Sequence, residues 1–287
     1  MIKVYRNLIF CLAFSFFFFN SQAQKLYFSD GGDVKRINLD GTGVQTIVTG
    51  TPYSYNYIAV DGYNNLLFYN NGQDVYSSKL DGTSPNQLTN DGAFAGYSNI
   101  AVIPDYEVLI YAGITDDQDD LWRGGYYDDP GNPPTLLTTG IDMGSDEEYY
   151  DIAYNPSEEK IYFTGYDGNV YSCYQDGTGA APISVSSLAS GPIGVDYSNN
   201  KVYWVQYSGG NYSIWRANLD GSGATSILSN GGASIESLDV YPEQNAVYFA
   251  QTDAIYRIAL NGTGKTTIFT GTYITNVAIN FDILPPT

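Results

Sequence analysis

The sequence NLDGTG, residues Asn38 to Gly43, is a polar corner that returns several times along the chain. Related corners are KLDGTS from Lys79, YQDGTG from Tyr174, NLDGSG from Asn218 and ALNGTG from Ala259. Glycine, asparagine and aspartate tolerate the left-handed backbone conformation that tight hairpin corners need. The repetition therefore predicts a series of equivalent units, each of which needs one such corner.

A second motif, a short apolar and aromatic run, accompanies the corners. Its six copies are LYF at Leu26, LFY at Leu67, LIY at Leu109, IYF at Ile161, VYW at Val202 and VYF at Val247. Successive copies begin 41, 42, 52, 41 and 45 residues apart. This period is typical of one four-stranded blade of a β-propeller, so the spacing predicts six blades.

Each unit contains four strand-like segments in a fixed order. In the first complete unit, a strand at Tyr57 to Asp61 is followed by strands at Leu66 to Tyr69 and Asp74 to Leu80. A Thr-rich fourth strand completes each sheet, as at Val44 to Val48 and Thr266 to Phe269. The 28 tyrosines and 31 glycines favour strands and turns. We therefore expect an all-β fold, a six-bladed β-propeller with four antiparallel strands per blade, over residues 25–282.

The two ends of the repeat array predict how the ring closes. The first-strand motif is IAVD at Ile58, IAVI at Ile100, IAYN at Ile152, IGVD at Ile193, LDVY at Leu238 and VAIN at Val277. Residues 25–28 form a second strand with no first strand before it, and Val277 to Asn280 form a first strand with no second strand after it. The C-terminal strand should therefore join the N-terminal blade, which removes an open sheet edge.

The segments outside the ring carry different signals. Lys3 and Arg6 precede an apolar run from Leu8 to Phe19 and the small-x-small sequence Ser21-Gln22-Ala23. This arrangement predicts a secretory signal peptide over residues 1–24, and hence a secreted, periplasmic or cell-surface protein. The run is short for a bilayer span, so no membrane insertion is expected. Residues 283–287 are expected to begin a linker that leads to a further C-terminal domain.

Charge and cysteine content limit the partners and the chemistry. The formal net charge is −19, and loss of Lys3 and Arg6 with the signal peptide changes it to −21. Such a surface repels nucleic acid and anionic lipid, so neither is an expected partner. Cys173 is the one cysteine that then remains, which excludes an internal disulfide. Its place in a strand pattern predicts a buried small hydrophobic residue.

The combined pattern of IAVD, an LYF or VYW run, an aromatic-Arg strand and LDGT resembles the YWTD repeats of LDL-receptor class B six-bladed propellers. The resemblance covers residues 25–280. The chain departs from that pattern at the Thr-Asp that follows Tyr-Trp, where the copies read Ser29-Asp30, Asn70-Asn71, Ala112-Gly113, Thr164-Gly165, Val205-Gln206 and Ala250-Gln251. The resemblance implies a secreted interaction scaffold that binds through one face or through its central channel. It does not carry the family's specific ligands to this chain.

One face of the expected propeller is rich in aromatic residues. In a four-stranded blade, the loops before the first strand and between the second and third strands share a face. The corners lie on the other. The corresponding segments are residues 49–56, 90–98, 139–150, 206–212 and 270–275. They carry Tyr53, Tyr55, Phe94, Tyr97, Tyr149, Tyr150, Tyr207, Tyr212 and Tyr273. Tyrosine can stack on sugars or grip peptides, which predicts a protein or glycan ligand; the alternative is that these rings pack against the blade ends.

Acidic residues on the same face raise the question of a metal. The third unit has an enlarged loop at residues 112–119 and a broken corner at residues 127–131. The candidate Ca²⁺ ligands are Asp116, Asp117, Asp119, Glu147 and Glu148. Their order does not match the Asp-x-Asp-x-Asp-Gly calcium loop, which favours a solvated acidic rim. No other cofactor is expected.

The chain contains no histidine, which excludes Ser-His-Asp catalysis and histidine metal sites. A calcium-dependent lactonase or hydrolase that uses only carboxylates at the channel mouth remains an alternative to a non-catalytic binding scaffold. Asp239 is its candidate channel acid, because the other first strands have a small residue there: Ala59, Ala101, Ala153, Gly194 and Ala278. A carboxylate bonded to backbone groups or channel water is the competing explanation. A structural spacer in a larger surface protein is the third alternative.

Overall fold

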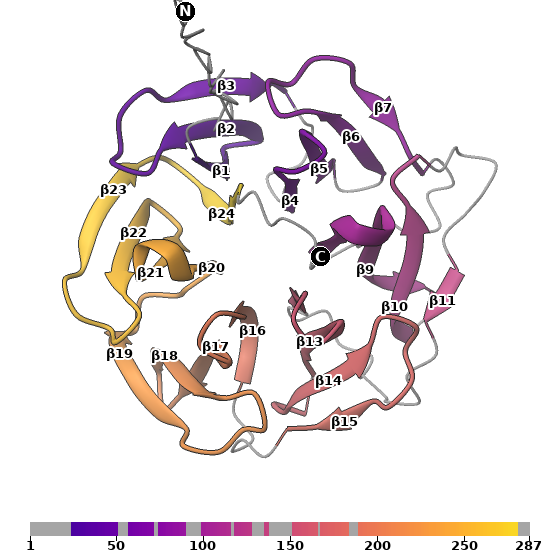
Figure 1. Ribbon diagram of the computed structural model, residues 1–287. Coiled ribbons are helices and arrows are strands. Elements are labelled where there is room, and N and C mark those ends of the chain that lie inside the picture. Colours follow the sequence, from indigo (N-terminus) through magenta and orange to yellow (C-terminus); the bar gives the residue numbers. More distant parts are fainter. Residues whose placement is uncertain are drawn as a thin grey trace, which may run out of the picture.

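The protein is a ring of six four-stranded antiparallel sheets around a central axis (Figure 1). The computed structural model describes residues 24–50, 57–71, 74–89, 99–115, 118–127, 135–137, 151–165, 167–183 and 189–280. Within each sheet, neighbouring strands follow one another in the chain, except where the last strand of the protein joins the first blade. The expectation of a six-bladed propeller is confirmed.

The blades are numbered in chain order, and each is given from the axis outward. Blade 1 contains β24 (Ile274–Ile279), β1 (Lys25–Asp30), β2 (Asp33–Asn38) and β3 (Gln45–Val48). Blade 2 contains β4 (Ile58–Asp61), β5 (Leu66–Asn70), β6 (Val75–Lys79) and β7 (Asn86–Gln87). Blade 3 contains β8 (Asn99–Ile103), β9 (Val108–Thr115), β10 (Gln118–Gly125) and β11 (Thr135–Leu137).

The second half of the ring repeats this order. Blade 4 contains β12 (Ile152–Asn155), β13 (Lys160–Thr164), β14 (Val170–Tyr174) and β15 (Ala181–Pro182). Blade 5 contains β16 (Ala189–Asp196), β17 (Lys201–Ser208), β18 (Asn211–Asn218) and β19 (Thr225–Gly231). Blade 6 contains β20 (Ser237–Tyr241), β21 (Ala246–Gln251), β22 (Ala254–Ala259) and β23 (Thr266–Thr270).

The C-terminal strand closes the ring, as the sequence predicts. β24 pairs with β1 in a register that places Leu26 opposite Ile279 and Phe28 opposite Val277. Figure 1 shows the yellow end of the chain beside its indigo beginning. Asp30 Oδ1 reinforces this junction because it accepts the N–H groups of Thr272 at 2.9 Å and Tyr273 at 3.2 Å.

Burial falls from the second strand of a blade to its edge. Every residue of β21 is buried, because blades on both sides cover that strand. β18 buries only two of its eight residues, and the threonine-rich β23 buries none. A strand that is covered on both faces needs a continuous apolar run. The LYF and VYF motifs therefore mark the strands that pack between neighbouring blades.

The repeated corner packs against the preceding blade at blades 1, 2 and 6. In every copy that the structure describes, a side-chain oxygen of the Asp or Asn at the third corner position accepts hydrogen bonds from the N–H and the hydroxyl group two residues later. Asp40 does so with Thr42 at 2.9 and 2.7 Å. In the copies at Gly41, Gly82 and Gly262, the following glycine lies against the outer strand of the preceding blade. A Cβ atom on Gly262 would lie 1.9 Å from the carbonyl oxygen of Ile227, and one on Gly82 would lie 2.2 Å from that of Ile47. These glycines are therefore required for interblade packing as well as for their left-handed backbone.

Two segments expected to be loops are extended hairpins instead. β17 and β18 pair as far as Ser208 and Asn211, so the connection shrinks to Gly209 and Gly210, which have φ angles of +58° and +83°. Two consecutive glycines with positive φ suit a two-residue hairpin turn, which lets the strands continue. In blade 3, β9 continues to Thr115 and β10 begins at Gln118, so most of residues 112–119 is strand.

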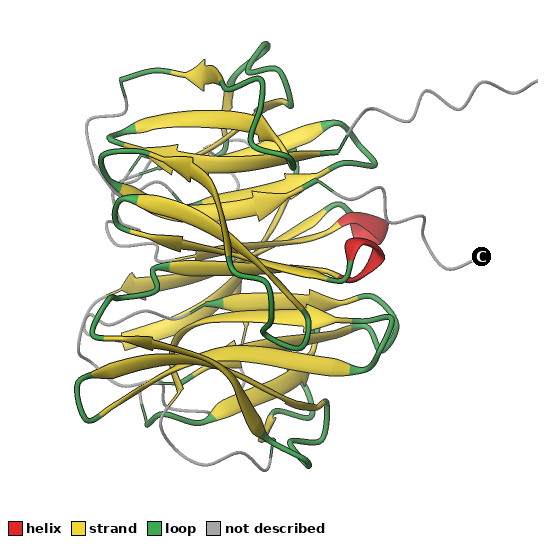
Figure 2. Ribbon diagram, turned by 90° about the vertical axis from the view of Figure 1, so that its left-hand side faces the viewer, coloured by secondary structure: helices red, strands yellow, loops and turns green. Residues whose placement is uncertain are grey.

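The two faces of the ring differ in their connections. We call the face with the loops before the inner strands and the hairpin at Gly209 and Gly210 the upper face, and the opposite one the lower face. The hairpins between first and second strands lie on the lower face, including the short 3-10 helices η1 (Pro104–Tyr106) and η2 (Pro242–Gln244). Figure 2 shows both helices, in red, on the same side of the ring.

Candidate binding site

The six inner strands enclose a central channel with a cavity of about 140 Å³. Because each inner strand runs from the upper face to the lower face, equivalent residues form layers along the axis. The uppermost layer that lines the cavity contains Asn99, Asp151, Ser237 and Asn276. Two residues further along each strand is the layer of small residues, in which Asp239 replaces alanine or glycine.

Asp239 is one of the residues that line the channel cavity. Its Oδ1 accepts the N–H of Val240 at 2.8 Å, and its Oδ2 accepts the N–H of Ile279 in the next blade at 2.8 Å. The residue is partly buried and faces the lumen. The carboxyl group therefore joins the inner strands of blades 6 and 1, which agrees with the structural explanation given above.

Asp151 is a second channel acid, and sequence reasoning missed it. Its Oδ1 accepts the N–H of Ile152 at 2.8 Å, and its Oδ2 accepts the N–H of Ile193 in blade 5 at 2.9 Å. The residue is 9% exposed. It immediately precedes the IAYN motif, so a comparison of the six motifs extended by one residue toward the N-terminus would have found it.

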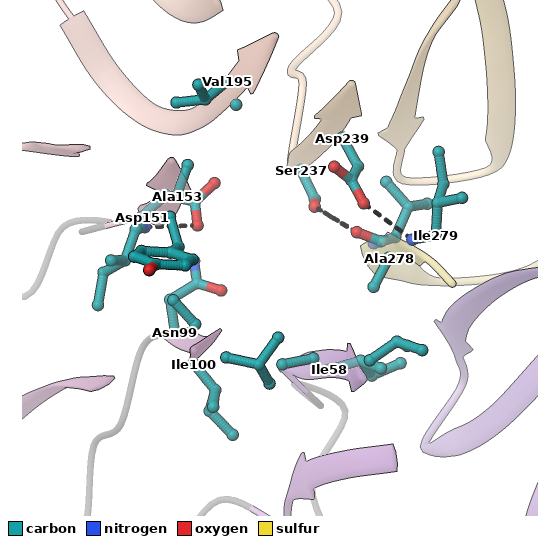
Figure 3. A pocket seen from close by; sticks show the side chains of 18 of the residues that line it. Ile58, Asn99, Ile100, Asp151, Ala153, Val195, Ser237, Asp239, Ala278 and Ile279 are labelled. Atoms are coloured by element: carbon teal, nitrogen blue, oxygen red, sulfur yellow. Dashed lines mark hydrogen bonds between the residues drawn. The ribbon is translucent and has the colours of Figure 1, made fainter. Parts of the chain in front are cut away.

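The two carboxyl groups line the same cavity. Figure 3 shows Asp151 and Asp239 on either side of the lumen. Burial raises the pKa of each to about 7, although the bonds from backbone N–H groups oppose the shift. The charge of Asp239 also raises the pKa of Asp151. No basic residue lies among the described residues that line the cavity.

Neutral side chains of the upper layer make similar contacts between blades. Asn276 Oδ1 accepts the N–H of Ile58 at 3.2 Å, and Ser237 Oγ accepts the N–H of Val277 at 3.2 Å. The inner strand of a blade has a free edge toward the channel, so its N–H groups need partners outside the sheet. These side chains, with Asp151 and Asp239, supply them.

The described part of the tyrosine-rich face lies mainly in blade 5. Tyr207 is 47% exposed, and its ring centroid lies 4.7 Å from that of Tyr212. The two residues are opposite each other in the β17–β18 ladder. Tyr273 lies between β23 and β24 on the same face and is partly buried. The other candidates, Tyr53, Tyr55, Phe94, Tyr97, Tyr149 and Tyr150, lie outside the described residues.

The proposed metal ligands are only partly within the described structure. Asp119 lies in β10, opposite Ile114 of β9. Asp116, Asp117, Glu147 and Glu148 lie outside the described residues. Within the described ranges, no three Asp, Glu, Cys or His side chains come together as a metal site would require.

The lower face carries exposed aromatic residues that sequence reasoning did not select. Tyr63, Tyr106, Tyr127 and Tyr174 are between 48% and 66% exposed. Tyr106 and Tyr174 line a shallow hollow between blades 3 and 4, with Arg123 and Glu159 beside them. Residue type alone does not separate them from buried tyrosines such as Tyr162 and Tyr203, because the repeat uses tyrosine in both places.

Cys173 is a free and buried residue of β14, as predicted. Burial raises the pKa of its thiol to about 12, so the reactive thiolate is scarce at neutral pH. No helix in the described residues is long and apolar enough to cross a membrane.

Comparison with known proteins finds similarity in the fold alone. No protein-family model matches the chain, and no curated protein matches its sequence. A chain of the nidogen/laminin complex superposes with a TM-score of 0.73 at 14% identity, over 90% of this chain and 98% of that one. TolB from Acinetobacter baumannii has a TM-score of 0.71 at 13% identity, over 89% of this chain and 66% of that one.

The GH74 enzyme from Niastella koreensis is also similar, with a TM-score of 0.61 at 16% identity, over 86% of this chain and 44% of that one. Proteins with such different names share this architecture, so the likeness identifies a fold and leaves the activity open. By its structure, the chain is a six-bladed β-propeller.

Proposed function

We propose that the protein is a secreted, non-catalytic binding scaffold that recognises a protein or glycan through its upper face. The nine aromatic residues named above would supply the contact surface, and the acidic channel mouth would lie at its centre. In this proposal residues 1–24 direct export, and residues 283–287 lead toward a further domain.

The pair of Tyr207 and Tyr212 is the observation that most supports this proposal. Both rings are fixed to paired strands, and Tyr207 leaves about half of its surface exposed. A tyrosine on a rigid support loses little conformational entropy when it binds, and it offers both an apolar ring and a hydroxyl group. The similar propeller chain in a nidogen/laminin complex illustrates that a ring of this shape can take part in a protein complex.

Two tyrosines with matched exposure on opposite faces provide the test. Tyr207 on the upper face is 47% exposed, and Tyr174 on the lower face is 48% exposed. Wild-type protein would be screened on a glycan array and on an array of extracellular proteins, and each hit would then be measured with Tyr207→Ala and Tyr174→Ala. We expect Tyr207→Ala to weaken binding at least tenfold, with Tyr53→Ala and Tyr150→Ala acting in the same direction. Binding that is lost in Tyr174→Ala and retained in Tyr207→Ala would contradict the proposal.

A further inference from the structure

We propose that the hollow on the lower face, between blades 3 and 4, is a low-affinity binding site for one neutral sugar ring. The proposal goes beyond the function proposed above, because it concerns the opposite face of the propeller and a free sugar. The side chains on which it rests are those of Tyr106, Arg123, Glu159, Tyr174, Gln175 and Asp176, all of which line the hollow.

Two contacts between blades recur elsewhere in the ring on this face. In blade 1, Tyr27 Oη and the Arg36 guanidinium donate to the carbonyl oxygen of Leu80 in the corner of blade 2, at 3.2 and 2.8 Å. The same two bonds, at 3.3 and 3.0 Å, join blades 5 and 6 through Tyr203, Arg216 and Leu260. A tyrosine and an arginine therefore hold the corner of the next blade at these two junctions.

The junction between blades 3 and 4 lacks both contacts. Ile110 lies opposite Arg123 in the β9–β10 ladder, in the place that Tyr27 has opposite Arg36 in the β1–β2 ladder. Isoleucine has no donor to offer. The guanidinium group of Arg123 is exposed, and it forms no hydrogen bond or ion pair with any residue that the structure describes. The hollow lies where these contacts are missing.

The corner of blade 4 also differs from the other corners. Its second position is Gln175, where the other described copies have Leu39, Leu80, Leu219 and Leu260. Gln175 lines the hollow, and its Oε1 is buried without a hydrogen-bond partner. A buried acceptor without a donor is uncommon in native proteins. A hydroxyl group of a ligand would supply the missing donor.

Glu159 has an unfavourable backbone conformation beside the hollow. It immediately precedes the second strand of blade 4 and has a φ of +53°. The equivalent residues of blades 2, 5 and 6 are Asn65, Asn200 and Asn245, and asparagine tolerates this left-handed conformation better than glutamate does. Unfavourable backbone conformations cluster at functional sites. The choice of glutamate here therefore agrees with a role for its carboxylate in binding.

The chemistry of the lining favours a neutral ring with hydroxyl groups over an ion. Tyr106 and Tyr174 are each 48% exposed and offer the faces of their rings. Arg123 supplies hydrogen-bond donors, while Glu159 and Asp176 supply acceptors. The two carboxylates would repel an anion, and the guanidinium group would repel a cation. A sugar has hydroxyl groups that both donate and accept, and C–H groups that pack on a tyrosine ring.

The size of the hollow sets the expected affinity. Its volume is about 500 Å³, which lies within the range of ligand pockets, but the hollow is shallow. A single ring that keeps part of its surface in water should bind in the millimolar range. Such weak binding does not survive the washing of an array. Tyr174→Ala therefore remains a valid control for the array ligands of the upper face.

Saturation-transfer NMR on the wild-type protein tests the proposal directly. The probes would be the methyl glycosides of glucose, galactose, mannose and N-acetylglucosamine. We expect at least one of them to receive saturation from the protein, most strongly at the C–H protons of one ring face, because that face packs on a tyrosine. Glycerol, which has adjacent hydroxyl groups and no ring, should receive none. Absence of transfer to all four glycosides, or equal transfer to glycerol, would overturn the proposal.

Two glutamates with the same backbone conformation provide matched variants. Glu159→Asn removes a carboxylate from the hollow. Glu107→Asn makes the same change at the equivalent position of blade 3, where φ is +51° and the side chain does not line the hollow. Asparagine suits this conformation at both positions, so neither variant should lose binding through misfolding. We expect Glu159→Asn to weaken glycoside binding at least about fivefold, and Glu107→Asn to leave it unchanged; equal effects would overturn the proposal.

Tyrosine variants separate this site from the rest of the surface. Tyr106→Ala should weaken glycoside binding at least about fivefold. Tyr63→Ala should leave it unchanged, because Tyr63 is 54% exposed on the same face but lies outside the hollow. Tyr207→Ala should also leave it unchanged. Loss of glycoside binding in Tyr207→Ala would overturn the proposal by placing the sugar on the upper face, whereas loss of array ligands alone leaves it intact, so the two proposals can fail separately.

Two simple ions test the ionic alternatives. The N–H of Thr178 donates to Asp176 Oδ1 at 2.9 Å, so its signal in a ¹H–¹⁵N spectrum reports on one wall of the hollow. We expect the glycoside to shift this signal, and sodium phosphate and n-butylammonium chloride to leave it unchanged at equal ionic strength. If either ion shifts the signal and displaces the glycoside, the hollow is an ion site and the proposal is overturned.

Discussion

Replacement of Gly262 by alanine tests whether the repeated corner holds the blades together. Gly262 has a φ of +86°, and an added Cβ would lie 1.9 Å from the carbonyl oxygen of Ile227 in the neighbouring blade. Cβ atoms essentially never come within 3.0 Å of another heavy atom, so corner and strand would have to separate by about 1 Å. The same corner contains Gly264, with a φ of +72° and no atom within 4 Å of the added Cβ. Gly264→Ala is therefore a matched control for backbone conformation without the interblade clash.

The backbone conformation and the interblade clash set the expected changes in the free energy of unfolding. A left-handed conformation of an L-residue lowers the free energy of unfolding by roughly 1–2 kcal/mol. Alanine also reduces the entropy of the unfolded chain, which raises the free energy of unfolding by about 0.4–1 kcal/mol. Gly264→Ala should therefore lower the free energy of unfolding by about 1 kcal/mol. Gly262→Ala should lower it by a further ~1–3 kcal/mol, the usual range for overpacking.

Urea unfolding followed by circular dichroism would measure the difference, with equal m-values required for a valid comparison. Gly82→Ala and Gly41→Ala extend the series, because their added Cβ atoms would lie 2.2 and 2.6 Å from the carbonyl oxygens of Ile47 and Ile268. We expect the loss of stability to decrease in the order Gly262, Gly82, Gly41. Equal destabilisation by Gly262→Ala and Gly264→Ala would refute the assignment of the corner as an interblade contact.

Three further predictions concern other parts of the ring. Because the pKa values of Asp151 and Asp239 are near 7 in the folded protein and near 3.9 in an unfolded chain, the folded state binds more protons between these values. The two carboxyl groups should therefore stabilise the folded state fully below about pH 4, and this stabilisation should be lost as the pH rises through 7. Urea unfolding at several pH values should show that the free energy of unfolding depends less on pH in the Asp151→Asn/Asp239→Asn variant than in the wild-type protein. Asp30→Ala should lower the free energy of unfolding by about 1–3 kcal/mol, because it leaves two backbone N–H groups without their acceptor. Hydrogen exchange of the β24 amides should become faster, and unchanged exchange would contradict the role of Asp30 in ring closure. Glu107→Asn should raise the free energy of unfolding by a few tenths of a kcal/mol, because Glu107 has a φ of +51° and asparagine tolerates that conformation better; a lower midpoint in urea would contradict this.

Much of the architecture could be predicted because each blade repeats the same local requirements. The aromatic runs occur once per blade, and each one marks a strand that is covered on both sides. The C-terminal strand could be assigned to the first blade because Val277 to Asn280 repeat the inner-strand motif without a following partner. Hairpin lengths were less predictable, as the extension of β17 and β18 to Gly209 and Gly210 illustrates, since strand ends depend on pairing that the motif does not encode.

The sequence by itself determined six equivalent sheets, their strand order and the closure of the ring, because repeat period and motif order reflect local hydrogen bonding and burial. It also indicated Asp239 as an unusual acid, since the other five inner strands have alanine or glycine in its place. Only the tertiary structure decided that Asp151, from a different blade, faces the same lumen. It also decided that the corner glycines Gly41, Gly82 and Gly262 meet carbonyl groups of another blade. Those relations arise when blades far apart in the chain are packed around one axis, and so they depend on distances between blades that no single repeat contains.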